Sequence, residues 1–88
     1  MEVSFKILYA KSVQKDIKNL DNKTKEKIRK AIENLKNFPN IPNIKSLKSH
    51  PLADYRLRVG DYRILFDVDW ENKTIYILKI GHRKDIYD

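Results

Sequence analysis

Apolar and polar residues alternate along the first part of the chain, which is the pattern of a half-buried β-strand. One side of residues 2–9 carries Val3, Phe5, Ile7 and Tyr9, and the other begins with Glu2, Ser4 and Lys6. Because successive strand residues point to opposite faces, this period of two predicts a strand with one face against a core.

The following residues change to a helical spacing of apolar positions. The two apolar series are Ala10, Val13, Ile17 and Leu20, and then Ile28, Ala31, Ile32, Leu35 and Phe38. Asp21 and Asn22 interrupt the pattern and can cap the second helix, which must end before Pro39. We therefore expect two consecutive helices, an αα-hairpin with lysine-rich outer faces.

A proline- and asparagine-containing stretch over residues 40–54 predicts a loop, and a β-hairpin follows it. Two runs of strand-forming residues flank Gly60-Asp61, a two-residue turn in which glycine supplies the positive φ. Residues 74–81 predict a third strand of the same sheet. The turn predicts a register with these opposed pairs: Val59 and Tyr62, Arg58 and Arg63, Leu57 and Ile64, Tyr55 and Phe66.

The order strand, helix, helix and three antiparallel strands predicts an α+β fold, a single compact domain over residues 1–88. The helices must cover an apolar sheet face, and only one face of the hairpin qualifies. That face carries Tyr55, Leu57, Val59, Tyr62, Ile64 and Phe66. We therefore expect both helices on this side and an open face on the other.

The expected open face is rich in arginine. The chain has five arginines and fourteen lysines, and four of the arginines fall on this face: Arg56, Arg58, Arg63 and Arg83. Like charges directly opposed across a sheet cost about 0.2–1 kcal/mol per pair. Guanidinium groups bind phosphate in a bidentate manner and keep their charge when crowded, so we interpret the face as a phosphate-binding surface. The alternative is ordinary ion pairing with Asp67, Asp69, Asp85 or Asp88.

Three lysines and one glycine extend this interpretation. Lys79 shares the arginine face of the last strand, and Lys45 and Lys48 precede the hairpin and enlarge the basic surface. Gly81 lies between Lys79 and Arg83, where the missing side chain leaves room for a ligand to approach the sheet. Leu78, by alternation, belongs to the opposite face.

Composition narrows the function classes. The 88 residues carry a formal net charge of +7 and contain no cysteine. The charge favours an anionic partner such as nucleic acid, although a solvated lysine-rich surface is the alternative. The two histidines, His50 and His82, lack metal-ligand spacing, so we expect no metal site and no cofactor. Without an 18-residue apolar run or a signal peptide, we expect a cytoplasmic protein with no membrane contact.

Three segments together carry a family resemblance. They are KSLK at residues 45–48, YRLRVGDYRILFDV at residues 55–68 and ILKIGHRKDIY at residues 77–87. With the order of elements, they resemble the RelE/ParE toxin superfamily, closer to its RelE branch, over essentially the whole chain. The resemblance implies the toxin of a toxin–antitoxin pair, a ribosome-dependent endoribonuclease that cuts mRNA in the A site by attack of a 2′-OH on the adjacent phosphate.

The resemblance also implies roles for particular residues. Arg63 would hold the scissile phosphate, and Arg83, in the Gly-x-Arg motif, would stabilise the transition state. Tyr87 matches the family's tail tyrosine, which stacks on or deprotonates the nucleotide. Lys48 matches a basic loop residue that touches RNA, and we expect Lys45 and Lys79 to bind RNA as well because they lie on the same basic surface. The implied partners are the ribosome, mRNA and a RelB-like antitoxin.

One departure from the family pattern bears on the chemistry. Arg56 and Arg58 stand where relatives carry a Lys-x-Lys, and arginine keeps its charge, so these two are electrostatic stabilisers and poor bases. The base is then Tyr87, or His82 if it turns toward the site, or catalysis relies on positioning. From sequence, Tyr87 could also be an anchoring ring. A ParE-like gyrase inhibitor and a non-catalytic RNA- or ribosome-binding module remain alternative functions.

Overall fold

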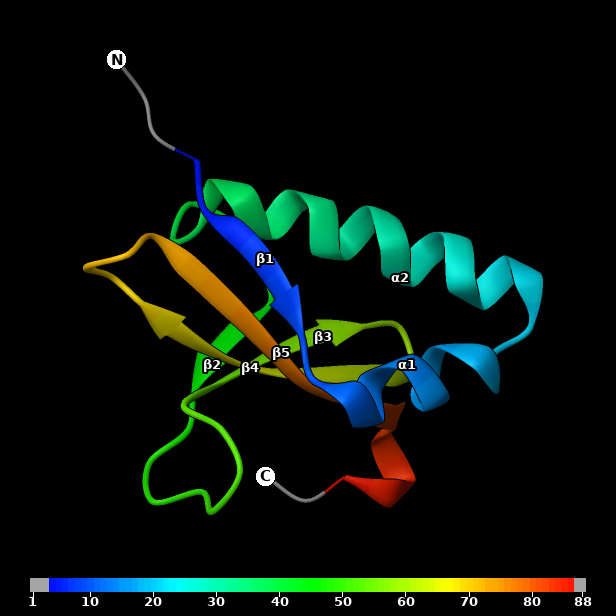
Figure 1. Ribbon diagram of the computed structural model, residues 1–88. Coiled ribbons are helices and arrows are strands. Elements are labelled where there is room, and N and C mark those ends of the chain that lie inside the picture. The colour runs from blue at the N-terminus through cyan, green and yellow to red at the C-terminus, as the bar shows by residue number, and fades with distance from the viewer. Residues whose placement is uncertain (1–3, 87–88) are drawn as a thin grey trace.

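The computed structural model describes residues 4–86 (Figure 1). Its elements are β1 (Lys6–Tyr9), α1 (Lys11–Lys18), α2 (Asn22–Asn34), the 3₁₀ helix η1 (Leu35–Asn37), β2 (Ile44–Ser46), β3 (Tyr55–Val59), β4 (Tyr62–Asp69), β5 (Thr74–His82) and the 3₁₀ helix η2 (Arg83–Asp85). The five strands form one sheet in the order β1-β5-β4-β3-β2. β1 is parallel to β5 and the other pairs are antiparallel. The expected α+β single domain is confirmed, with a mixed sheet.

The hairpin of β3 and β4 has the predicted turn and register. Gly60 has a φ of +57°, as the two-residue turn requires. All four predicted cross-strand pairs are present, from Val59 and Tyr62 at the turn to Tyr55 and Phe66 at the far end. The predicted arginine and apolar faces of this hairpin therefore follow from the sequence.

The helices agree with their apolar spacing and their caps. The Asp21 carboxylate accepts a hydrogen bond of 2.9 Å from the Thr24 N–H, so the predicted N-cap of α2 is confirmed. α2 ends at Asn34, and η1 completes the last turn before Pro39. α1 lies against β5 and α2 against β3, so each helix of the expected αα-hairpin packs on the sheet. No helix within residues 4–86 is long and apolar enough to cross a membrane.

The main core lies between the helices and the predicted face of the sheet. Its buried members are Phe5, Val13, Ile28, Ile32, Leu35, Phe38, Leu57, Ile64, Phe66, Ile75, Ile77 and Ile80. The Phe38 ring packs edge-on against the Phe5 and Phe66 rings, with centroids 5.8 and 5.9 Å apart. These aromatic contacts join the start of the chain, the end of the helical region and the centre of the sheet.

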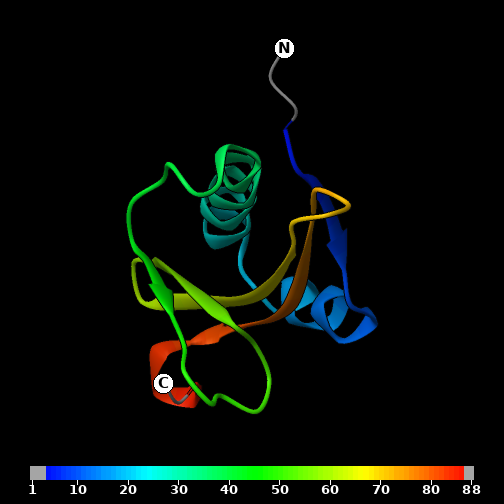
Figure 2. The same ribbon diagram turned by 90° about the vertical axis from the view of Figure 1, so that its left-hand side faces the viewer.

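The opposite face of the sheet is partly covered, so the expectation that it is open is wrong for its centre. Leu65 is 1% exposed and packs with Leu47 and Ala53, and the partly buried Leu78 and Ile86 complete this second cluster. Figure 2 shows the 47–54 loop and the C-terminal segment on the side of the sheet away from α2. Leu47, Ala53 and Ile86 lie outside the regular elements, so alternation within β4 could not reveal that they pack on Leu65.

Two expectations from the sequence for β5 are wrong, one about Leu78 and one about Gly81. An irregularity in the β4–β5 ladder between Leu65 and Phe66 breaks the alternation, so Leu78 packs with Leu65 on the arginine side. A Cβ on Gly81 would lie 3.0 Å from the Ile86 Cδ1 atom. The space that the sequence assigned to a ligand is therefore occupied by Ile86.

Two strands differ from their predicted bounds. β2 lies inside the predicted 40–54 loop, where three residues flanked by turns give no detectable alternation. β1 begins at Lys6 and not at residue 2, and residues 2–3 lie outside the described part of the chain. β2 is important for the site, because it carries Lys45 to the edge of the arginine face.

Candidate phosphate-binding site

The predicted basic residues form two neighbouring rows on the sheet face away from the helices. The first row runs across four strands as Lys45, Arg56, Leu65 and Lys79. The second row contains Arg58, Arg63 and Gly81. The structure thus brings Arg56, Arg58, Arg63 and Lys79 onto one face, as alternation predicted, and β2 adds Lys45 to that face. We call Arg56, Arg58, Arg63 and Arg83 the arginine cluster.

Arg63 lies at the centre of the arginine cluster and is held by the hairpin turn. Its Nη1 donates hydrogen bonds to the carbonyl oxygens of Gly60 and Tyr62, at 2.9 and 3.0 Å. These acceptors are neutral, so they fix the guanidinium without cancelling its charge. Burial, followed by the charges of Arg56, Arg58 and Arg83, lowers the pKa of Arg63. An anion bound here relieves that repulsion.

Arg83 joins the cluster from η2 rather than from the last strand. Its backbone N–H donates a 2.7 Å hydrogen bond to the Asp61 carbonyl oxygen, and its Nε lies 3.7 Å from Asp61 Oδ1. Asp61 was missed as a site residue by the sequence analysis. Extending the hairpin register to β5 pairs Tyr62 with His82, and this places residues 61 and 83 side by side.

Two of the carboxylates that could have neutralised the arginines have other partners. Asp67 Oδ1 accepts a 2.7 Å hydrogen bond from the Asp54 N–H. The Asp69 carboxylate accepts hydrogen bonds from the backbone and the side chain of Asn72. These two residues therefore give no support to the ordinary ion-pair interpretation of the arginine face.

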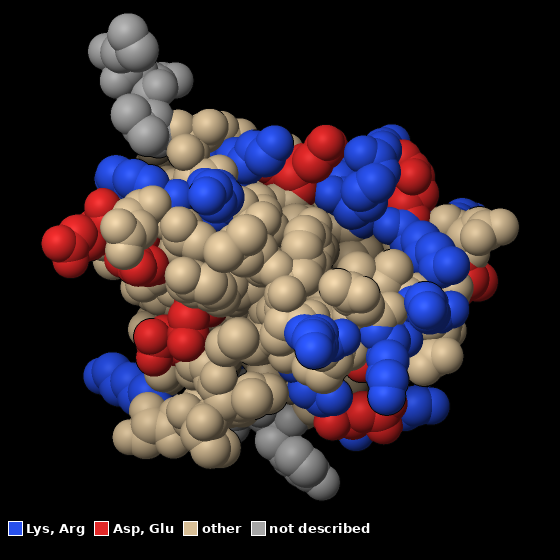
Figure 3. Space-filling model, viewed as in Figure 1, with Lys and Arg blue, Asp and Glu red and all other residues tan. Residues whose placement is uncertain are grey.

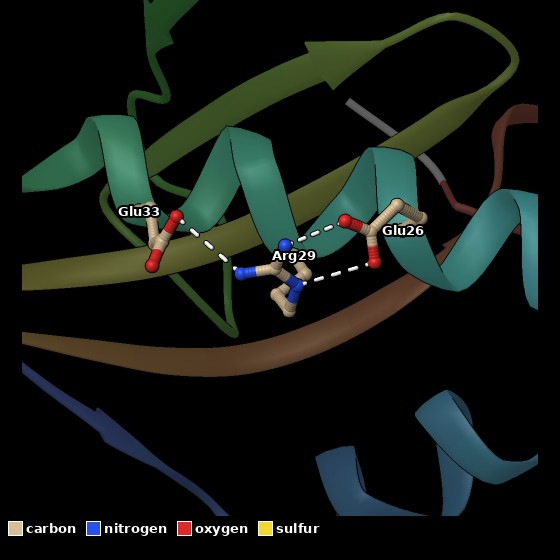
Figure 4. A network of polar contacts seen from close by, with 3 residues as sticks. All are labelled: Glu26, Arg29 and Glu33. Atoms are coloured by element: carbon tan, nitrogen blue, oxygen red, sulfur yellow. Dashed lines mark hydrogen bonds and ion pairs between the residues drawn. The ribbon is translucent and has the colours of Figure 1, made fainter.

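The fifth arginine shows the contrasting arrangement. Arg29 on α2 lies between Glu26 and Glu33 and forms ion pairs with both (Figure 4). Hydrogen bonding to Glu26 and the charges of both glutamates raise the pKa of Arg29. Along the upper edge of Figure 3, where α2 lies, basic and acidic side chains are likewise intermixed. Charge on the helix is balanced locally, whereas the charges of three neighbouring arginines act on Arg63 and Asp61 pairs with Arg83.

Lys48 lies beside the arginine face, at the rim of a groove of about 390 Å³. The groove separates the loop over residues 48–52 from η2, and Lys79 and Asp85 also line it. Its floor includes Leu65, the apolar member of the first row of the sheet. Lys48 and Lys79 therefore lie on the same groove, although they are far apart in the sequence.

The remaining candidates are His82 and Tyr87. His82 lies on the helix-covered side, as expected, with its ring 5.5 Å from the Tyr62 ring and its Nδ1 accepting from the Lys84 N–H. Tyr87 lies outside the described residues. Within residues 4–86, no group of three or more His, Cys, Asp or Glu side chains is arranged to hold a metal ion.

Comparison with known proteins shows which family shares this sequence and fold. Residues 7–87 match the family model described as the ParE toxin of the type II toxin–antitoxin system parDE. Toxin RelE3 of Methanocaldococcus jannaschii is 36% identical over 88 aligned positions, covering 94% of this chain and 96% of the relative.

Two solved complexes have the same fold. The RelE–RelB complex from Pyrococcus horikoshii matches with a TM-score of 0.77 and 26% identity, over 96% of this chain and 100% of the other. The RelB–RelE complex from Methanococcus jannaschii gives a TM-score of 0.73 and 36% identity, over 92% and 95% of the two chains. The chain therefore belongs to the RelE/ParE superfamily and is a RelE-like toxin of a type II toxin–antitoxin system.

Proposed function

We propose that this toxin is a ribosome-dependent endoribonuclease that cuts mRNA in the ribosomal A site. The observation that carries the proposal is the arginine cluster, in which Arg63 is fixed by two carbonyl groups and surrounded by three further arginines. Such a site binds a phosphate group tightly, and it favours a state with additional negative charge even more.

The proposed reaction is an internal transesterification. The 2′-oxygen attacks the adjacent phosphorus, the bond from phosphorus to the 5′-oxygen breaks, and the products are a 2′,3′-cyclic phosphate and a 5′-hydroxyl. The 2′-OH loses its proton and the leaving oxygen gains one, so no net charge is created. Between these events the phosphorus centre carries an extra negative charge, which preorganised cations stabilise. No metal ion or cofactor takes part.

Each residue of the site has a role in this reaction that follows from its position. Arg63 holds the scissile phosphate and Arg83, placed beside it by Asp61, stabilises the charge that develops. Arg56 and Arg58 add positive potential, since guanidinium groups are poor bases. Tyr87 stacks on the nucleotide or assists proton removal.

Lysines on the same side extend the RNA path beyond the scissile phosphate. Lys45 lies opposite Arg56 in the sheet, and Lys48 and Lys79 line the adjoining groove. We propose that these three hold the phosphates that flank the cut. Because each acts as a point charge, they contribute affinity rather than base recognition.

The proposal includes a protein partner. Two of the structural relatives are in complexes of RelE with RelB. We propose that a cognate, RelB-like antitoxin binds this toxin and covers the basic face. Charge complementarity makes an acidic or amphipathic antitoxin segment the expected form.

The test is cleavage mapping in a purified translation system. The toxin should cut ribosome-bound mRNA at A-site codons and leave naked RNA intact. Arg63→Ala and Arg83→Ala should each lose most of the activity, whereas Arg29→Ala, the matched arginine on α2, should keep it. Intact mRNA with the wild-type protein, or an equal loss in all three variants, would contradict the proposal.

The family model that matches the chain favours one alternative. Its description names a ParE toxin, and a ParE-like gyrase inhibitor is compatible with the sequence. A supercoiling assay with purified gyrase separates the two functions. Inhibition of supercoiling without mRNA cleavage would replace the proposed nuclease with the gyrase inhibitor.

A further inference from the structure

A groove with a mostly apolar surface lies beside the arginine cluster. It has a volume of about 390 Å³, with Leu65 and Ile86 among its apolar residues and Pro51 and Leu52 on the loop side. Leu65 is 1% exposed, whereas Leu52 is 45% exposed, a large apolar side chain facing solvent. Polar groups lie around this apolar surface, and they include Lys48, Lys79 and Asp85.

The groove lies next to the arginine cluster on the same sheet face. Leu65 follows Arg63 by two residues in β4, so both side chains point to the same face, about 6.6–6.8 Å apart along the strand. Across the sheet, Leu65 lies between Arg56 and Lys79. A ligand whose anionic group binds the arginines can therefore reach the groove, because the distance is only the spacing of two residues along the strand.

We propose that this groove binds the base of the nucleotide whose phosphate rests on the arginine cluster. The inference rests on the proposed function and adds a base-reading element to it. An apolar floor disfavours a second phosphate, because a charge there would lose its hydration. A nucleobase suits both parts of the site: its faces pack on Leu52 and Ile86, and its polar edge meets Asp85, while Lys48 and Lys79 stay with the flanking phosphates.

The loop that forms one wall is ordered by its own hydrogen bonds. The Leu52 N–H donates to His50 Nδ1 at 3.1 Å, and the Leu47 N–H donates to the Asp54 carbonyl oxygen at 2.8 Å. The Asp54 N–H in turn donates to Asp67 Oδ1 on β4 at 2.7 Å. A wall held in this way can select among bases, since it does not have to be rebuilt when the ligand binds.

The first test uses the isolated toxin and small ligands. Binding of the four nucleoside monophosphates and of ribose 5-phosphate is followed by NMR shifts. We expect at least one nucleotide to bind more tightly than ribose 5-phosphate, and Leu52→Ala to weaken that nucleotide by about fivefold while leaving ribose 5-phosphate unchanged. Leu8→Ala, on a leucine in β1 that is 42% exposed, is the matched control and should bind like the wild type.

The second test repeats the cleavage map with Leu52→Ala, which should change the preference among codons more than the total cutting. Equal binding of nucleotides and ribose 5-phosphate by the wild type, with no effect of Leu52→Ala, would overturn the base site. The two proposals fail separately. Base-dependent binding without mRNA cleavage would support the base-binding groove and contradict the nuclease. Cleavage of mRNA with the same codon profile in Leu52→Ala as in the wild type would support the nuclease and contradict the base-binding groove.

Discussion

Arg58 on β3 lies directly opposite Arg63 on β4, and both side chains share the sheet face away from the helices. Neutral residues there would give a more stable hairpin, because opposed like charges repel across the short cross-strand distance. Burial and this neighbouring charge lower the pKa of Arg63. The pair is therefore a site where stability and anion binding oppose each other.

Replacing one member of this pair should separate the two properties. We expect Arg58→Gln to raise the free energy of unfolding by about 0.2–1 kcal/mol while it slows mRNA cleavage. Urea denaturation at low salt measures the gain, which should shrink as NaCl screens the repulsion. Arg29→Gln is the control, and it should lower the free energy of unfolding, because that arginine pairs with Glu26 and Glu33. A loss of stability in Arg58→Gln would show that the opposed charges are already compensated.

A helix side chain completes the hydrogen bonding of the last strand. Asp16 Oδ2 on α1 accepts a 3.1 Å hydrogen bond from the Ile80 N–H, beyond the last pairing of β1 with β5 at Tyr9 and Ile77. Ile80 is 3% exposed, so its N–H has little access to water if that acceptor is lost. Asp16→Ala should cost about 1–3 kcal/mol of unfolding free energy, and Asp16→Asn, which keeps an acceptor, should cost less.

Hydrogen exchange of the Ile80 amide gives a local readout of the same contact. Exchange should accelerate in Asp16→Ala more than in Asp16→Asn. Equal stability of the two variants, with an unchanged Ile80 amide, would show that the carboxylate has no role there.

The parts of the fold that were predicted correctly depend on local patterns. The Gly60-Asp61 turn fixed the hairpin register, and Asp21 marked the start of α2, because turn and cap chemistry act between near neighbours. The misses depend on tertiary contacts. Leu78 changes face at an irregularity in the ladder, and Ile86 covers Gly81 from a segment with no periodicity.

The site, like the fold, was predicted where it depends on local pattern and missed where it depends on tertiary contacts. Alternation placed Arg56, Arg58 and Arg63 together, since they belong to one hairpin. Asp61 became part of the site only through the contact of the turn with η2, which sequence periodicity does not encode.

That turn supplies a further prediction about Arg83. Asp61→Asn removes the carboxylate beside Arg83 and leaves the backbone hydrogen bond between the two residues in place. RNA should bind more tightly, because a negative charge near the arginine cluster is lost, yet single-turnover cleavage should slow because Arg83 is held less firmly. Binding and single-turnover assays at several salt concentrations measure both effects. Parallel changes in affinity and rate would assign Asp61 a purely electrostatic role.

The pH dependence of stability provides a test at Tyr9. Partial burial, and then the charge of Glu33, raises the pKa of Tyr9 above its ordinary value, although the side chain is 44% exposed. The folded state therefore keeps this proton when the unfolded state has begun to lose it, near pH 10. The contribution of Tyr9 to the free energy of unfolding is complete at pH values below the pKa of the unfolded state. It disappears as the pH rises through the pKa of the folded state.

Unfolding free energies between pH 9 and 11, about the ordinary pKa of tyrosine, should fall less steeply in Tyr9→Phe than in the wild type. Glu33→Gln should have a smaller effect of the same sign, because burial is the larger cause of the shift. Identical slopes in the wild type and Tyr9→Phe would show that Tyr9 titrates alike in both states.

The contact of Gly81 with Ile86 links stability to the position of Arg83. An alanine Cβ at residue 81 would lie 3.0 and 3.2 Å from two Ile86 side-chain atoms, so Ile86 must shift by a few tenths of an ångström. Because glycine within a strand is less stable than alanine, Gly81→Ala should gain about 0.5–1 kcal/mol once Ile86→Ala has removed the obstruction. With Ile86 present, the gain should be smaller or become a loss.

A double-mutant cycle in urea measures this difference as a coupling energy. Cleavage should fall in Gly81→Ala alone, since moving Ile86 also moves η2, which carries Arg83. It should recover partly in the double variant if the shift of η2 is the cause. Equal effects of Gly81→Ala in both backgrounds would mean that Ile86 does not constrain residue 81 and has no part in positioning Arg83.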